Sequence, residues 1–248
     1  MKTILSYGGG TNSKAIAVEM VRRGEKIDAI TFSDTGGEKP ETYKDVHETS
    51  DWLVSRGYPE IIWLRKPHKV GSIEVLSLED ECLSSRNLPG IAYGFGSCSD
   101  KWKMQPFKKW LKSTGWADVV VLIGFDADEQ HRADRGDDYK SGYSKRYPLI
   151  EWGWGREDCI EAIKKSGLSL PGKSACFFCP SSKKSEVIGL KYSHPDLFKR
   201  AVAIEKNADL TKIKGLGRNY SWADLSEADD LQDDLFGKPI PCVCWDGD

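Results

Sequence analysis

The 248-residue sequence lacks the features that mark membrane, secreted and nucleic-acid-coating proteins. It has no run of about 18 apolar residues, the length that a membrane-spanning helix needs. Residues 1–10 hold one lysine and a short apolar run before the glycines, too little for the core of a signal peptide. The net charge of −2 excludes a broadly basic surface, although it allows a local basic patch. We therefore expect a cytoplasmic globular protein without a membrane segment.

Cysteine is abundant, with seven in the chain. The number is odd, and Cys176 and Cys179 form a close C-x-x-C pair. In a reducing compartment this pattern favours a metal site or redox chemistry over a disulfide framework. Soft thiolates at such spacing suit either zinc or an iron–sulfur centre. The sequence does not choose between the two.

Strands and helices alternate along the first half of the chain, which predicts an α/β fold with a doubly wound, mostly parallel sheet. The run 119–123 is apolar on both faces, as a central strand covered by helices must be. Residues 65–103 contain Pro67, Pro89 and four glycines, and we expect a long excursion over the carboxyl edge of the sheet and not a further core layer. The expected strands are 3–5, 27–33, 61–64 and 119–123, and the expected helices are 13–23 and 41–56.

The pattern becomes helical after Pro148, with helices expected at 156–165, 182–192 and 195–207. Cys159 lies at a core-facing position of the first of these helices, so we interpret it as a buried hydrophobic residue. The predicted organisation is a nucleotide-binding α/β domain over 1–150, a helical appendage with the C-x-x-C pair over 151–210, and a tail over 211–248.

The segment 6–13, which reads SYGGGTNS, follows the first expected strand and opens the first helix. Its glycines let backbone amides face an anion, the helix terminus adds partial positive charge, and Thr11 and Ser13 can donate hydroxyls to phosphate. Neither the Walker ending nor the Rossmann glycine spacing is present. The segment predicts a phosphate-binding loop, the alternative being a tight turn with a serine cap. The expected ligands are Ser6, Gly8, Gly9, Gly10, Thr11, Asn12 and Ser13.

Residues 9–13 resemble the Ser-Gly-Gly-x-Asp-Ser loop of the ATP pyrophosphatase and phosphoadenosine phosphosulfate (PAPS) reductase superfamily. Asn12 stands where the family has aspartate, which removes a negative charge beside the nucleotide. Two further segments are similar to PAPS reductases, Asp34-Thr35-Gly36 after the second strand and the PETY sequence at 40–43. The resemblance covers about residues 4–190. It implies that ATP or PAPS binds with Mg²⁺ at the loop and with its sugar near Asp34.

The stretch from Cys98 to Pro106, with the later C-x-x-C pair, is similar to iron–sulfur sulfonucleotide reductases, although Ser99 replaces their second cysteine. The resemblance implies a 4Fe–4S cluster, with Zn²⁺ as the alternative. Cys242 is a further candidate for the fourth ligand, and idle, reduced cysteines are the alternative to any metal. The expected metal ligands are Cys98, Cys176, Cys179 and Cys244.

The segment 124–132 follows the apolar strand at 119–123. Gly124, Glu129 and Arg132 fit the family's pattern, and Gly124 is an expected nucleotide contact. Asp126 stands where the family commonly has arginine, so a bound sulfate or additional phosphate would meet an anion, which counts against PAPS. His131 is either a general acid or base or a solvated loop residue. The expected catalytic residues are Ser13, Asp34, Lys103 and Arg132.

These motifs predict an ATP pyrophosphatase-type sulfurtransferase, which adenylates an acceptor that sulfur then attacks. The first alternative is a PAPS or adenylyl-sulfate reductase, in which Cys242 or Cys244 is the nucleophile. The second is a noncatalytic nucleotide-sensing module, suggested by Asn12. The implied partners are an adenine nucleotide and a sulfur donor, whereas the oligomeric state is open.

A nucleic acid is a candidate acceptor, because basic residues concentrate near the C-x-x-C pair beside Phe177 and Phe178, which we expect to be exposed. The alternative is a solvated helix face. The basic residues are Lys173, Lys183, Lys184, Lys191, Lys199 and Arg200.

Overall fold

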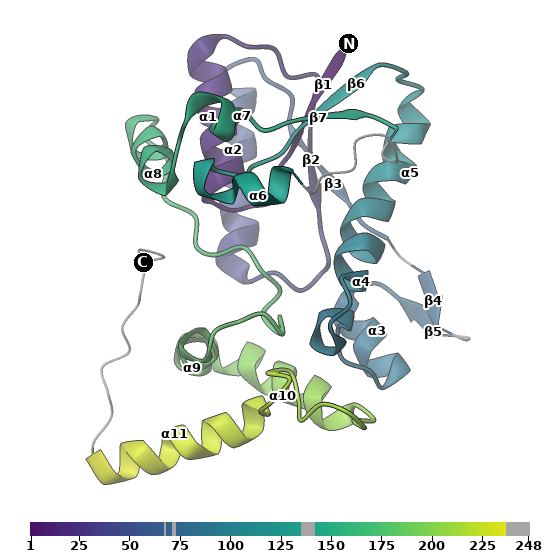
Figure 1. The fold of residues 1–248 in the computed structure, drawn as a ribbon, viewed down its shortest axis with the longest axis vertical. Coiled ribbons are helices and arrows are strands. Elements are labelled where there is room, and N and C mark those ends of the chain that lie inside the picture. Colours follow the sequence, from purple (N-terminus) through teal and green to yellow (C-terminus); the bar gives the residue numbers. More distant parts are fainter. Residues whose placement is uncertain (67, 71–72, 135–141, 237–248) are drawn as a thin grey trace. The chain divides into compact units, whose positions relative to one another are not determined.

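The computed structural model describes residues 1–66, 68–70, 73–134 and 142–236 (Figure 1). By its internal contacts the chain divides into two units, each assembled from three stretches of sequence. The sheet unit comprises Met1–Ser33, Lys39–Leu64 and Pro106–Ser174. The second unit comprises Asp34–Glu38, Arg65–Gln105 and Ala175–Asp248. None of the described helices is long and apolar enough to cross a membrane.

The sheet unit is built on a five-stranded sheet with the order β3-β2-β1-β6-β7. Every neighbouring pair in this sheet is parallel, and Leu5 in β1 aligns with Ile30 in β2 and Leu122 in β6. The predicted α/β class is therefore confirmed. The strands are β1 (Lys2–Ser6), β2 (Ala29–Ser33), β3 (Ile61–Leu64), β6 (Val119–Leu122) and β7 (Ser144–Arg146).

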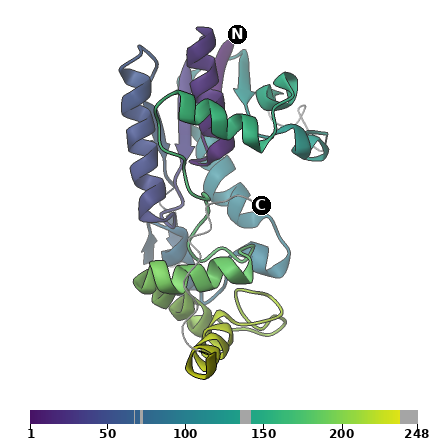
Figure 2. The same cartoon turned by 90° about the vertical axis from the view of Figure 1, so that its left-hand side faces the viewer.

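Helices cover both faces of this sheet (Figure 1). The strand order runs outward from β1 to β3 and then returns to β6 on the other side of β1. Because parallel crossovers are right-handed, this reversal places α1 and α2 on one face and α5 on the other. Figure 2 shows α8 beside α1, its main partner. The helices are α1 (Thr11–Arg23), α2 (Pro40–Val54), α5 (Gln105–Thr114), α6 (Gln130–Ala133), α7 (Pro148–Trp152) and α8 (Arg156–Lys165).

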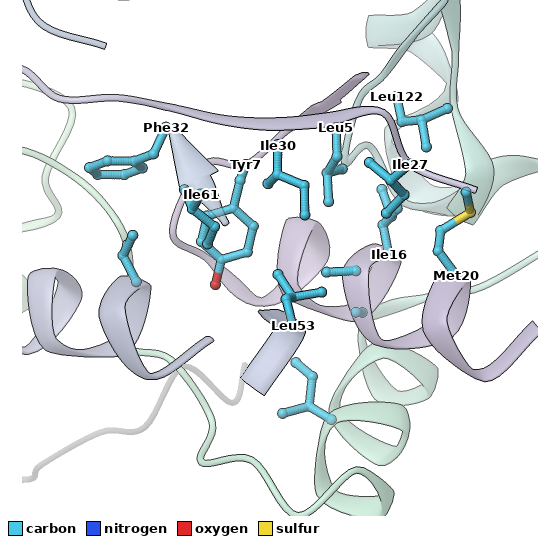
Figure 3. Packing of buried hydrophobic residues seen from close by; sticks show 14 of the residues in the cluster. Leu5, Tyr7, Ile16, Met20, Ile27, Ile30, Phe32, Leu53, Ile61 and Leu122 are labelled. Carbon is cyan, nitrogen blue, oxygen red and sulfur yellow. The ribbon is translucent and has the colours of Figure 1, made fainter. Parts of the chain in front are cut away.

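The core of the sheet unit lies between the strands and the helices α1, α2 and α8 (Figure 3). Leu5 and Ile30 project from the central strands and meet Ile16 of α1 and Leu53 of α2, all fully buried. Cys159 of α8 belongs to the same cluster and is also fully buried, which confirms its interpretation as a hydrophobic residue. The cluster fixes the ends of β1 and β2, where the candidate site begins.

The second unit has a hydrophobic core of its own. Leu78 and Trp102 from the stretch 65–105 pack in it with Phe178 and Ile204. The expectation that residues 65–103 form no core layer is therefore wrong, because their core side chains are separated by polar and charged residues and form no long apolar run. The elements are β4 (His68–Val70) antiparallel to β5 (Ile73–Val75), α3 (Leu78–Ser85), the turns Gly90–Tyr93, Ser97–Ser99 and Asp100–Met104, α9 (Lys184–Ser193), α10 (Pro195–Asn207) and α11 (Trp222–Phe236).

A buried ion pair supports the first helix of the sheet unit. Lys14 of α1 is fully buried, and its Nζ lies 2.6 Å from Asp45 Oδ1 of α2 and 2.9 Å from the carbonyl oxygen of Ser169. The Tyr7 hydroxyl donates to Asp45 Oδ2 at 3.4 Å and also contacts Thr49 Oγ1 at 3.2 Å. Burial and the Asp45 carboxylate raise the pKa of Tyr7 well above its usual range, so the hydroxyl stays protonated.

We predict that Asp45→Ala destabilises the chain by about 3–5 kcal/mol, because it leaves the Lys14 ammonium buried without its anion. Urea unfolding measures the change. The double variant Lys14→Met with Asp45→Leu should recover most of the loss, since it buries no charge. Lys44→Ala is the matched control, because Lys44 pairs with Glu48 in solvent and its removal should cost less than about 1 kcal/mol. An Asp45→Ala loss as small as this control would contradict the prediction.

Candidate functional site

The glycine loop joins the end of β1 at Ser6 to the start of α1 at Thr11. Gly9 has φ +75°, a conformation that favours glycine. A β-carbon on Gly9 would also lie 3.1 Å from Thr42 Cγ2 and 3.3 Å from Phe32. Both the left-handed turn and the close side chains therefore favour glycine at this position.

The Ser13 hydroxyl stabilises the loop through two hydrogen bonds to its backbone. It accepts a hydrogen bond from the Gly8 amide at 3.1 Å and donates one to the Gly10 carbonyl at 3.1 Å. The first turn of α1 carries no acidic residue, so the positive end of the helix dipole is not neutralised within that turn. The arrangement has the features of an anion site formed by backbone amides at a helix amino terminus.

The segment that follows β6 packs directly on this first turn. A β-carbon on Gly124 would lie 3.0 Å from the Ser13 amide nitrogen, so glycine is needed for the close approach. The Asn12 amide donates to the Gly124 carbonyl at 3.3 Å, to Asp126 Oδ2 at 3.0 Å and to Glu129 Oε2 at 3.4 Å. The structure thus brings Asn12, Ser13 and Gly124 together, as the motifs predict, and adds Asp126.

Arg132 lies on the short helix α6, beyond this segment. It forms an ion pair with Glu129, and its guanidinium stacks over the Phe125 ring at 4.2 Å. Phe125 in turn stacks on Tyr147, with ring centroids 5.5 Å apart. Because stacking and the ion pair orient the guanidinium, Arg132 is held in place near the glycine loop through Glu129. Its catalytic role stays a prediction.

Asp34 directly follows β2 and belongs to the second unit. Its Oδ1 accepts a hydrogen bond from the Gly36 amide at 2.8 Å, and its Oδ2 accepts one from Arg65 Nε at 2.7 Å. The Asp34 side chain is fully buried and already pairs with Arg65. A sugar that bound Asp34 would have to share this carboxylate with Arg65. Sequence reasoning missed Arg65. Its position directly after β3 could have indicated it, because ligands of parallel sheets bind at the carboxyl ends of the strands.

Cys176 lies against the segment that Asp34 begins. Its Sγ is 3.0 Å from Thr35 Oγ1, and the Phe177 amide donates to the Gly37 carbonyl at 2.7 Å. Burial, with a further contribution from the Glu38 carboxylate, raises the pKa of the Cys176 thiol to about 12, whereas Thr35 and Lys103 oppose the shift. Lys103 Nζ is 3.9 Å from Glu38 Oε1. Glu38, which sequence reasoning missed, thus lies beside the predicted Lys103 and raises the pKa of Cys176 through its charge.

The cysteines do not form a ligand cluster in the part of the chain that the structure describes, where no three His, Cys, Asp or Glu side chains are placed to hold a metal ion. Cys98, Cys176 and Cys179 all belong to the second unit, and the Cys179 amide closes a tight turn onto the Cys176 carbonyl at 2.9 Å. Cys242 and Cys244 lie outside the described residues. The three thiols match a soft metal chemically, and the metal ligands stay a prediction.

The aromatic pair beside the C-x-x-C motif is buried. Phe177 and Phe178 belong to the second core, so the expectation that they are exposed for stacking on nucleic-acid bases is wrong. Their apolar rings pack in this core with side chains of α9 and α10, which removes the rings from solvent.

Two of the six basic residues nearby, Lys191 and Arg200, form ion pairs with acidic residues. Lys191 Nζ lies 2.9 Å from Asp229 and 2.5 Å from Asp230 of α11, and Arg200 pairs with Glu79. Part of the predicted tail, 222–236, is thus the helix α11, whose aspartates pair with Lys191. This arrangement weakens the electrostatic argument for nucleic acid at this surface.

A cleft of about 560 Å³ lies at the other end of α1 from the glycine loop. Val18 and Arg22 of α1 line it, together with Trp52 of α2 and Trp154. Its size is within the range of small-molecule sites. It contains none of the predicted site residues.

Comparison with known proteins gives distant matches. No family model matches the chain. An uncharacterised protein of Methanocaldococcus jannaschii is 24% identical over 215 residues, an alignment that covers 79% of this chain and 40% of that protein. The chain thus spans about two fifths of the length of the curated relative it matches.

Two solved structures are similar to the chain. One is phosphoadenylyl-sulfate reductase from Candida auris in a phosphate complex, with a TM-score of 0.47, 18% identity, and coverage of 69% of this chain and 75% of that one. The other is the U34-tRNA thiolase NcsA from Methanococcus maripaludis with its 4Fe–4S cluster, with a TM-score of 0.47, 14% identity, and coverage of 82% and 70%. These are the kinds of protein that the motifs resemble. The class that the structure itself defines is a doubly wound α/β protein, and its function has to be argued from its own residues.

We predict that Cys176 in metal-free protein resists alkylation. With a pKa of about 12 against an ordinary value of 9.0, its thiolate fraction at pH 9 is lower by two to three orders of magnitude. The sign follows from burial, which disfavours the charged form, so reactivity should rise only as the pH approaches 12. Mass spectrometry after iodoacetamide treatment measures the rate. Unfolded protein is the control, and a Cys176 rate in folded protein equal to that control would contradict the prediction.

Proposed function

We propose that the chain is an enzyme that binds ATP at the glycine loop, cleaves it between the α and β phosphates and adenylates an acceptor for sulfur transfer. The observation that carries this proposal is the loop itself. Gly9 adopts a left-handed conformation in a crowded turn, and α1 begins directly after it without an acidic residue in its first turn. Loops of this kind bind the phosphates of nucleotides.

Adenylation of the acceptor depends more on stabilising the charge of the departing pyrophosphate than on a reactive side chain. An oxygen of the acceptor attacks the α phosphorus, the bond to the bridging oxygen breaks, and pyrophosphate leaves with the electron pair. The amides of the segment 8–13 and the dipole of α1 would stabilise the charge that develops on pyrophosphate. Magnesium, when bound, would neutralise part of the same charge. Adenylation turns the acceptor oxygen into a good leaving group, which a sulfur nucleophile then displaces.

The buried carboxylate of Asp126 supports ATP over PAPS as the nucleotide. Asp126 is 8% exposed and is linked to the first turn of α1 through Asn12. A sulfate or an additional phosphate that is not neutralised by a cation would be repelled by this carboxylate. A reductase would need a cation at this position, and the arrangement provides an anion.

The sulfur step is proposed for the second unit, which carries Cys98, Cys176 and Cys179. With Cys244 they make the proposed ligand set for an iron–sulfur cluster or zinc, either of which would bind and activate sulfur. Because metal binding requires thiolates, the raised pKa of Cys176 means that a metal would have to displace its proton. The catalytic roles of Asp34 and Lys103 stay predictions.

We predict that isothermal calorimetry with magnesium present detects ATP binding that is tighter than PAPS binding. Ser13→Ala should weaken ATP about fivefold to tenfold, because the loop loses the hydroxyl that holds the Gly8 amide and the Gly10 carbonyl. Ser55→Ala is the matched control, since Ser55 is an exposed serine at the end of α2. Tighter binding of PAPS would favour the reductase, and the absence of nucleotide binding would refute the proposed function.

We predict that protein purified without oxygen contains iron and absorbs near 400 nm, or is colourless and contains zinc. Cys176→Ser should lose the metal, whereas Cys159→Ser should keep it, because Cys159 is a core residue of the sheet unit. Deletion of residues 240–248 tests the fourth ligand. Loss of metal on deletion supports ligation by the tail, loss of turnover alone supports a tail nucleophile, and metal-free wild-type protein would contradict the cluster proposal.

A further inference from the structure

The side-chain amide nitrogen of Asn12, on the first turn of α1, lies within hydrogen-bonding distance of three acceptors. Its Nδ2 is within 3.3 Å of the Gly124 carbonyl oxygen, 3.0 Å of Asp126 Oδ2 and 3.4 Å of Glu129 Oε2. All three partners are acceptors, and two of them are carboxylates. Only a donor satisfies them, so the nitrogen of asparagine fits here and the oxygen of an aspartate would not.

The segment 124–129 cannot move away from α1 without losing close backbone packing. The position of a β-carbon on Gly124 is 3.0 Å from the Ser13 nitrogen and 3.2 Å from the Asn12 carbonyl carbon. The Ala127 amide also donates to the Trp154 carbonyl at 2.9 Å. Asn12 therefore acts on a segment that is already pressed against the helix.

The two carboxylates are fixed by further contacts within the segment. Asp126 Oδ1 accepts from the Asp128 amide at 3.2 Å, as the cap of the turn Ala127–Glu129. Glu129 forms its ion pair with Arg132, whereas Asp126 has no ion pair among the described residues. Asn12 thus holds a buried negative charge, compensated by amide hydrogen bonds, beside the amino end of α1.

We propose that Asn12 is a positioning residue that locks the segment 124–129 onto α1 and fixes the Asp126 and Glu129 carboxylates beside the glycine loop, so that the loop accepts ATP as its magnesium complex and disfavours a bare polyanion. The part on ATP rests on the proposed function. The physical reason is that fixed carboxylates repel a nucleotide whose phosphates are not neutralised, and this repulsion is strong where solvent screening is weak.

The lock is tested by thermal unfolding of the full chain. Asn12→Asp places a third carboxylate against two others, and should lower the melting temperature by about 5 °C or more. The double variant Asn12→Asp with Asp126→Asn restores a donor between the two positions and should regain part of the loss. Asn87→Asp is the control, because the Asn87 amide is exposed and bonds only a carbonyl of its own turn in the described contacts.

The specificity is tested by calorimetry with ATP in magnesium and in EDTA. Wild-type protein should bind the magnesium complex at least tenfold more tightly than free ATP, and Asp126→Asn should reduce that ratio severalfold. A merely structural role would leave the ratio unchanged. An Asn12→Asp melting temperature equal to that of Asn87→Asp, or an unchanged ratio in Asp126→Asn, would overturn the inference.

The two proposals fail separately. If wild-type protein binds no ATP, the proposed function fails, and with it the part of the inference that concerns ATP. The melting series still tests whether Asn12 locks the segment. If ATP binds but Asp126→Asn leaves the magnesium ratio unchanged, the proposed function stands and the inference fails.

Discussion

Close packing around two glycines at the carboxyl ends of β1 and β6 is the constraint on which the sheet unit depends. Gly9 must turn through a left-handed conformation beside Thr42, and Gly124 must come within contact of the first turn of α1. Neither position has room for a side chain. The same glycines lie next to the amino terminus of α1, a position where anion sites commonly form.

Two buried polar interactions hold the first turn of α1 in this arrangement. The Lys14 and Asp45 pair connects α1 to α2 within the core, and the Asn12 amide connects α1 to the segment after β6. Each group costs desolvation, which its hydrogen bonds offset at least in part. Such groups are expected where a helix must keep one position, because a slipped helix would leave a charge unpaired. The first turn of α1 is thus fixed on two sides.

Regular patterns allowed the sequence to predict the α/β class, the four apolar strands and the long helices α1, α2, α8, α9 and α10. The short polar strand β7 carried no apolar signal and was missed. The core of the second unit was missed because Leu78 and Trp102 lie dispersed among turn residues. At the site, the glycine loop was predicted from its residues and its place between a strand and a helix. The partners of Asn12 and Cys176 were not predicted, because contacts between segments far apart in sequence leave no local pattern.

The central claim is that the glycine loop holds the phosphates of ATP, and a crystal of the full chain soaked with magnesium and a nonhydrolysable α,β-methylene analogue of ATP tests it most directly. The account predicts phosphate oxygens within hydrogen-bonding distance of the backbone amides between Gly8 and Ser13. Phosphates bound elsewhere, for example in the cleft lined by Trp52 and Trp154, with an empty glycine loop, would contradict it.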